Sequence, residues 1–164
     1  MNIRMATEAD LQPLLQLINA AFDVERFFKV EDRLNPATLL SYFKKGSFLV
    51  LEEQGKLIAT VYVERVDDRA YLGLLSVDPG QQKRGLGRRM TAAAEEFARE
   101  MGARFMDLTV VNLRTELPAI YEKLGYQVTG TAAFPAQQMP VTQPCHFICM
   151  TKELGHRADQ TARF

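Results

Sequence analysis

The chain has 164 residues, of which 47% are hydrophobic and 24% are charged, a composition typical of one globular domain. Its 20 Lys and Arg residues balance its 20 Asp and Glu residues, so the composition provides no overall basic field for binding nucleic acid. Two cysteines are too few for a disulfide-rich secreted domain.

The sequence predicts neither a membrane span nor a metal site. No apolar run approaches the roughly 18 residues that a spanning helix needs, and the N-terminal MNIRMATEADLQ turns polar too soon for a secretory signal. We therefore expect a cytoplasmic protein. Cys145 and Cys149 would share one face of a strand as buried thiols, whereas His146 would face the other way, so these groups do not converge on one ion.

Helical patterns give way to strand patterns in the first half of the chain. Residues 2–5 can form a short strand, and Thr7 suits the N-cap of a helix over residues 8–22, whose apolar residues recur at helical spacing. Asn35 followed by proline predicts a second helix over residues 36–45. Three antiparallel strands with short polar turns are then predicted over residues 47–54, 56–66 and 69–77.

The second half begins with a polar, glycine-rich segment, residues 78–87, that leads into a strong helix. The predicted elements that follow are a helix over residues 90–101, a strand over 103–111, a helix over 115–124, and strands over 126–134 and 145–154. The strand–helix–strand unit over residues 69–111 should be a right-handed crossover, which makes its two strands parallel.

This order of elements predicts an α/β fold: a mixed, mostly antiparallel sheet of about seven strands flanked by helices. We expect one domain over residues 1–154. Residues 155–164 show no periodicity and are expected to fray.

Residues 82–87 open the strong helix shortly after a strand that ends at Val77, and they suit an anion. The first amides of a helix lack partners within it and lie at the positive end of the helix dipole, while glycines let an anion approach the backbone. Lys83, Arg84 and Arg88 add positive charge. This combination predicts a site for a pyrophosphate.

Three other interpretations of this segment can be weighed. A nucleotide-binding P-loop requires Lys and then Ser or Thr after its second glycine; Gly80 and Gly85 have the right separation, but Leu86 and Gly87 follow. A dinucleotide fingerprint requires a third glycine where Met90 stands. The simplest alternative is a helix start with a solvated basic turn.

The pattern QxxGxG at residues 82–87, after LSVDP at residues 75–79, resembles the cofactor motif of the GNAT superfamily of N-acetyltransferases. The segment YEKLGY at residues 121–126 resembles a second motif of that superfamily, on the expected helix. The order of predicted elements also resembles the GNAT fold over residues 2–154. The resemblance implies an acetyl-CoA-dependent N-acyltransferase in which the two parallel strands splay apart at their C-terminal ends.

The resemblance also implies roles for particular residues. The pantetheine arm of acetyl-CoA would pair with the strand backbone, the pyrophosphate would bind loop amides, and an amide near Val77 would stabilise the oxyanion that develops on the thioester. Tyr121 would protonate the leaving thiolate as a general acid, although a core aromatic is an equally ordinary use of this residue. The implied cofactor-binding residues are Leu75, Ser76, Val77, Gln82, Lys83, Arg84, Gly85, Leu86, Gly87 and Arg88.

The sequence departs from the family pattern at two places. Many relatives carry Asn seven residues before the Tyr, where this chain has Arg114, with Asn112 two residues earlier. Asn112 is a candidate for the pantetheine contact; Arg114 could face the substrate, a cofactor phosphate or solvent. Many relatives also carry a Glu base in the strand before the motif, which here reads GLL. Glu64 and Tyr71 are the candidate replacements, unless each is an ordinary strand residue and the amine arrives neutral.

The acceptor cannot be identified from the sequence. We expect residues 22–46 and the 135–144 loop to overhang the acceptor and set specificity. A small-molecule amine is preferred, with a protein N-terminus or lysine as the alternative, and a CoA-binding module without activity as the rival. We expect no nucleic-acid or membrane partner, and a homodimer stays open.

Overall fold

A sheet of seven strands runs through residues 2–155, the part of the chain that the structure, a computed structural model, describes. The strands are β1 (Asn2–Met5), β2 (Ser47–Glu53), β3 (Lys56–Val66), β4 (Arg69–Val77), β5 (Phe105–Val111), β6 (Gln127–Ala133) and β7 (His146–Glu153). Their order in the sheet is β1-β2-β3-β4-β5-β7-β6. Fraying was predicted for residues 155–164. Apart from Gly155, these residues lie outside the part of the chain that the structure describes.

Four α-helices flank this sheet: α1 (Leu11–Ala21), α2 (Pro36–Lys45), α3 (Leu86–Glu100) and α4 (Leu117–Lys123). The predicted helix over 8–22 is split into a short 3-10 turn, η1 (Glu8–Asp10), followed by α1, and a second turn, η2 (Phe22–Glu25), extends it. A third turn, η3 (Pro79–Gln81), follows β4. The Asn35 side chain accepts a hydrogen bond from the Thr38 N–H and so caps α2 as predicted. None of these helices is long and apolar enough to cross a membrane.

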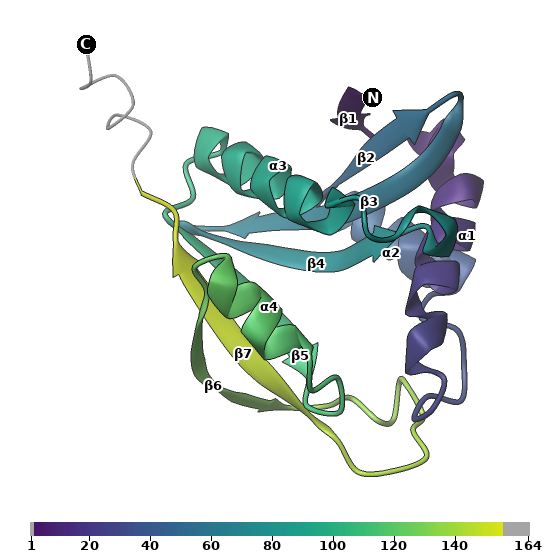
Figure 1. The fold of residues 1–164 in the computed structure, drawn as a ribbon, viewed down its shortest axis with the longest axis vertical. Coiled ribbons are helices and arrows are strands. Elements are labelled where there is room, and N and C mark those ends of the chain that lie inside the picture. The colour runs from purple at the N-terminus through teal and green to yellow at the C-terminus, as the bar shows by residue number, and fades with distance from the viewer. Residues whose placement is uncertain (1, 156–164) are drawn as a thin grey trace.

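The helices cover the sheet from both sides (Figure 1). On the α3 side, Met90, Met106 and Met150 belong to one buried cluster; on the α1–α2 side, Phe48 and Tyr62 belong to another. Alternating side chains of β2, β3 and β4 enter the two clusters, which accounts for the near-continuous burial of these central strands.

The parallel pair β4–β5 is confirmed, and it separates along its length. Within the described residues, the other strand pairs are antiparallel. Pairing between β4 and β5 extends only from Arg69–Phe105 to Tyr71–Asp107. Beyond that point the two strands diverge, as Figure 1 shows. The predicted fold, a mixed and mostly antiparallel sheet with a splayed parallel pair, is therefore the observed one.

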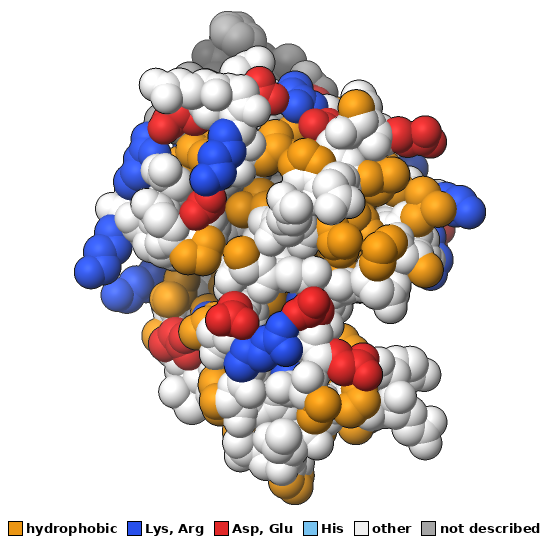
Figure 2. Space-filling view, turned by 90° about the vertical axis from the view of Figure 1, so that its right-hand side faces the viewer, with side chains coloured by type: hydrophobic (Ala, Val, Ile, Leu, Met, Phe, Trp, Pro, Cys, Tyr) orange, Lys and Arg blue, Asp and Glu red, His pale blue; other side chains and the backbone are white. Residues whose placement is uncertain are grey.

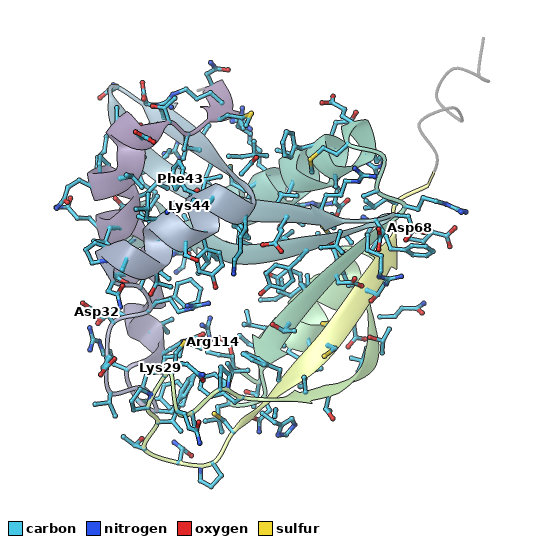
Figure 3. All side chains as sticks on the ribbon, turned by 180° about the vertical axis from the view of Figure 1, so that it is seen from behind. Lys29, Asp32, Phe43, Lys44, Asp68 and Arg114 are labelled. Carbon is cyan, nitrogen blue, oxygen red and sulfur yellow. The ribbon has the colours of Figure 1, made fainter. Side chains whose placement is uncertain are left out.

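The prediction of buried thiols is wrong. Cys145 precedes β7 rather than lying on it, and both Cys145 and Cys149 are free but only half-buried. Cys149 alternates with Ile148, which packs toward the α3 side. The opposite face of β7 lies beyond the reach of α1 and α2 (Figure 3), so its side chains keep contact with solvent.

Candidate active site

A cleft opens where β4 and β5 separate. The cavity has a volume of about 190 Å³ and is lined by the diverging parts of both strands, by η2 and the residues after it, and by α4 with its approach. Because pairing stops at Tyr71 and Asp107, the backbone of β4 facing β5 has no strand partner from Leu72 onward. Unpaired strand backbone in a cleft can bind an extended ligand by hydrogen bonds.

A β-bulge shapes the β4 wall of this cleft. Thr60 pairs with Ser76 and Tyr62 with Gly73, so a single β3 residue faces both Leu74 and Leu75. Leu74 has a φ of 52°, in the left-handed region that non-glycine residues rarely adopt. The buried Ser76 hydroxyl donates to the Leu74 carbonyl at 2.9 Å. Ser76 therefore supports the bulge, and its hydroxyl is not directed at a ligand.

A groove continues from the cleft to the glycine-rich loop. A second cavity, of about 470 Å³, is lined by Leu75, Val77 and Gln82. It shares Phe22, Leu75 and Arg114 with the cleft, so the two cavities adjoin. The structure thus brings predicted residues of the strand and of the loop onto one path.

The start of α3 has the features predicted for anion binding. Gly85 is the N-cap, with a φ of 73°, and it has no side chain to satisfy the first helical amides. A Cβ at Gly85 or Gly87 would meet no atom within 4 Å, so open space lies beside this backbone. The Leu86 side chain is buried in the core and anchors the helix start. The residues present therefore fit a pyrophosphate held by backbone amides.

The positively charged side chains of the loop differ in their partners and surroundings, which the sequence alone did not indicate. Arg84 is bonded to the Glu53 carboxylate, with Nη2 and Oε2 3.0 Å apart, and this hydrogen bond lowers the pKa of Glu53. Lys83 and Arg88 are exposed at the surface, and Arg88 borders a small cavity on the α3–α4 side. The amides, rather than Arg84, are the groups most available to a phosphate.

Tyr121 lies on α4 and lines the cleft. Its ring packs edge-on against Tyr126, with centroids 5.8 Å apart, and burial raises the pKa of its phenol to about 12. None of the described residues accepts a hydrogen bond from this hydroxyl, yet it is not sealed off from the cleft. Tyr121 is therefore a protonated phenol at neutral pH, as a general acid must be.

Arg114 belongs to a chain of ion pairs at the open end of the cleft. Its Nη1 is 2.9 Å from Glu25 Oε2 and its Nε is 3.0 Å from Glu116 Oε2. The other Glu25 oxygen is bonded to Lys29 Nζ, and burial lowers the pKa of Lys29. Figure 3 places Lys29 and Arg114 together, at the end opposite Asp68. With its side chain only 16% exposed, Arg114 is not a solvated surface cation.

Two predicted site residues lie elsewhere. The Asn112 side-chain oxygen accepts from the His146 N–H at 2.8 Å and fixes the start of β7. Glu64 accepts from the Tyr62 hydroxyl at 2.5 Å. Neither lines the cleft. Glu64 does not line the cleft because β4 lies between β3 and the cleft. Tyr71, which pairs with Glu64 in the strand register, does line the cleft.

Sequence reasoning missed the charged residues of the cleft, Glu25, Lys29 and Arg33. They lie in the 22–46 segment expected to overhang the acceptor, but no motif singles them out. Glu25 is the one carboxylate among the described residues that line the cleft, and both of its oxygens are engaged. The described residues contain no group of three or more His, Cys, Asp or Glu side chains that could hold a metal ion.

The fold and the cleft are those expected of an acyltransferase with a splayed strand pair. The model of the acetyltransferase (GNAT) family matches residues 11–126, more than half of the chain. The chain therefore belongs to this family, and the predicted family is confirmed.

Known proteins with similar sequences or folds agree with this assignment. The chain is 26% identical to mycothiol acetyltransferase of Propionibacterium freudenreichii over 144 residues, which are 84% of this chain but 46% of that protein. The chain thus spans about half the length of this relative.

Two solved structures share the fold. The ribosomal-protein-S18-alanine N-acetyltransferase of Escherichia coli superposes with a TM-score of 0.75 at 21% identity, covering 94% of each chain. The Salmonella typhimurium protein yncA, solved with its cofactor acetyl-CoA, gives a TM-score of 0.74 at 20% identity over 96% of this chain and 95% of that one.

Proposed function

We propose that this protein transfers an acetyl group from acetyl-CoA to a primary amine, preferably that of a small molecule. The observation that carries the proposal is the groove that runs from the cleft beside Tyr121 to Gln82, three residues before the glycine N-cap of α3. Family membership and the acetyl-CoA named with the Salmonella structure support the choice of cofactor. A cytoplasmic location and a homodimer stay predictions.

Acetyl-CoA would be held mainly by backbone groups. The amides from Gln82 to Arg88 would hold the pyrophosphate, and the unpaired edge of β4 at Leu75 and Val77 would hold the pantetheine arm. Ser76 would contribute through its backbone alone, because its hydroxyl is bonded to Leu74. We leave Asn112 and Glu64 out of the proposed site, since neither lines the groove.

The reaction is a direct acyl transfer. The amine nitrogen forms a bond to the thioester carbon, the carbon–sulfur bond breaks, and the nitrogen releases one proton to solvent. Tyr121 would donate its phenolic proton to the departing sulfur and regain one from water. Because no unengaged carboxylate of the described residues lines the cleft, we propose that the amine enters neutral instead of being deprotonated by a protein base.

A small acceptor is favoured by a third cavity. It has a volume of about 670 Å³, adjoins the cleft and lies between α1, α2 and the β6–β7 loop, a size that suits a small molecule. Acetylation of a protein N-terminus is the alternative, which the name of the Escherichia coli relative suggests. A CoA-binding module without activity is the rival from another class.

The test combines binding and turnover. Calorimetry should detect acetyl-CoA binding, and release of the CoA thiol should be followed across a library of small amines, peptide N-termini and lysine peptides. Amine-dependent release supports the enzyme. Tight acetyl-CoA binding without turnover on any amine would favour the non-catalytic module, and failure to bind acetyl-CoA would refute both.

A further inference from the structure

The third cavity, which we call the acceptor chamber, is built from two segments distant in sequence. These are residues 22–35, which join α1 to α2, and the β6–β7 loop, residues 134–145. The Val30 N–H donates to the Pro140 carbonyl at 3.2 Å, and the Thr142 N–H donates to the Phe28 carbonyl at 2.9 Å. This bridge ties the two walls together beside the cleft.

The chamber and the cleft meet at three residues, Lys29, Arg33 and Met139, which line both. Figure 2 faces the α1 side of the molecule and shows acidic and basic side chains gathered below the middle of this face, where the outline is indented. A molecule in the chamber that extends toward the cleft must therefore pass charged groups.

The charges at this junction do not cancel. Lys29 and Arg114 carry two positive charges, and Glu25 and Glu116, their bonded partners, carry two negative ones. This chain of four groups is neutral as a whole. Arg33 stands apart: among the described residues it has no carboxylate partner, and its guanidinium lies over the Phe22 ring, 5.6 Å from the centroid.

The carboxylates nearest to Arg33 in the chain do not neutralise it at the junction. Asp32 is bonded to Arg26, and both are about half exposed. Glu31 is exposed and lines the chamber but not the cleft. Arg33 is half-buried and faces both spaces. Among the described residues, Arg33 is thus a cation without an ion-pair partner at the junction itself, whereas the exposed Glu31 lines only the chamber.

We propose that the acceptor is an amine that also carries one carboxylate, of the amino-acid class, and that Arg33 binds this carboxylate. A guanidinium offers a planar pair of donors that fits a carboxylate. A single cation without an ion-pair partner matches a single negative charge better than a dianion. With the carboxylate on Arg33, the amine can lie in the cleft, toward the thioester and Tyr121. The inference rests on the proposed acetyltransferase function and specifies its substrate.

The experiment uses acceptors in matched sets. Leucine, methionine and phenylalanine are each compared with the corresponding carboxamide and the decarboxylated amine, and kcat/KM is measured at saturating acetyl-CoA. We expect the acids to be preferred about 10²-fold, the size of one charge-assisted hydrogen-bond pair in a partly buried site. Arg33→Gln should remove this preference by raising KM for the acids, while the decarboxylated amines change less than about 3-fold.

Arg104→Gln is the matched control. Arg104 also lies over an aromatic ring, that of Phe105, at 6.0 Å, but it precedes β5 at the closed end of the strand pair. This variant loses the same charge and a similar ring contact, so it should keep the wild-type preference. Calorimetric titration of the acids into the protein loaded with CoA gives a second measurement that does not depend on turnover.

The possible failures can be told apart. No binding of acetyl-CoA by the wild-type protein would refute the proposed function itself. If acetyl-CoA binds, the inference alone is overturned by any of three results: amides and decarboxylated amines react as well as the acids, Arg33→Gln keeps the preference, or none of the acids reacts or binds. A stronger response to phosphoethanolamine than to every acid would also overturn the choice of a carboxylate.

Discussion

The proposed cofactor side and the proposed acceptor side of the cleft would present different atoms to their ligands. On the cofactor side, the exposed groups are backbone amides at the start of α3 and the unpaired edge of β4. On the acceptor side, they are charged side chains, Lys29, Arg33 and Arg114, from segments far apart in the chain. One side is built from main-chain geometry and the other from side-chain chemistry.

This difference decides how substitutions can alter ligand binding on each side of the cleft. Backbone binding depends on conformation, so it tolerates most side chains but favours glycine where φ is positive and an anion needs space beside the backbone, as at Gly85. Side-chain binding depends on which residues stand at a few positions. Substitutions at Lys29 or Arg33 can therefore alter the acceptor while leaving the cofactor groove intact.

The largest effect is expected from Gly85→Val, which changes the backbone conformation and the free space on the proposed cofactor side. Its φ of 73° costs a branched side chain about 1–2 kcal/mol, and the new methyl groups would occupy the open space beside the amides. We expect acetyl-CoA affinity to fall on the order of 10²–10³-fold, the equivalent of about two lost charge-assisted hydrogen bonds. Calorimetry measures the affinity.

Gly102→Val is the control for this prediction. Gly102 follows α3, has a φ of 91° and also has no neighbouring atom within 4 Å of a built Cβ. It should carry similar backbone strain, visible as a lower Tm, without weakening acetyl-CoA binding. Equal affinities for the two variants would show that the amides at Gly85 do not hold the pyrophosphate.

Tyr121→Phe should separate chemistry from binding. The variant keeps the ring that packs on Tyr126 and removes only the proton donor. Since a thiolate is already a fair leaving group, we expect kcat to fall on the order of 10²-fold, the modest end of general-acid effects. Acetyl-CoA affinity should change little. A large affinity loss with kcat unchanged would make Tyr121 a binding residue.

The pH profile gives a second check on Tyr121. Because burial raises the pKa of its phenol to about 12, the acid form persists far above neutral pH. The kcat of the wild-type enzyme should therefore show no falling limb from loss of this proton below about pH 10. A fall in kcat near pH 8 that is seen in the wild-type enzyme but not in Tyr121→Phe would contradict a buried, neutral phenol.

The division between main-chain and side-chain binding also explains how much of the fold and of the site could be predicted from the sequence. Hydrophobic periods, the Asn35 cap and the glycines around α3 are local signals, and they predicted the sheet, the helices and the parallel pair. The bulge at Leu74 could not be predicted, because a leucine at positive φ is imposed by the register between β3 and β4. The Glu25 ion pairs could not be either, since Arg114 is 89 residues away.

Glu64 illustrates a further limit. Alternation along β3 and β4 places Glu64 opposite Tyr71, but only the structure shows which of the two borders the opening between β4 and β5. The sequence also cannot reveal that Ser76 turns its hydroxyl back to the bulge. Such contacts depend on tertiary geometry, which local patterns do not encode.

Glu25→Gln should have an intermediate effect, on stability. It leaves Lys29, whose side chain is 7% exposed, without its carboxylate partner, and Arg114 keeps only Glu116. We expect the free energy of unfolding to fall by about 2 kcal/mol, less than the full loss of a buried pair because Gln can still accept hydrogen bonds. Urea denaturation measures it, with Glu116→Gln as the control. An unchanged midpoint for Glu25→Gln would mean that the buried pairs contribute little net stability.

The smallest effect is expected from Arg84→Ala, although Arg84 stands within the cofactor motif. Its guanidinium is already bonded to Glu53 at the surface, and an exposed pair of this kind contributes little because water and salt screen it. If backbone amides hold the pyrophosphate, removing Arg84 should weaken acetyl-CoA binding by less than about 5-fold, the effect of an exposed and screened charge. The loss should shrink further in high salt. The measurement is calorimetric affinity at two salt concentrations, beside Gly85→Val. A loss as large as that of Gly85→Val would show that a side-chain charge dominates the cofactor side, and the contrast between the two halves of the cleft would then be wrong.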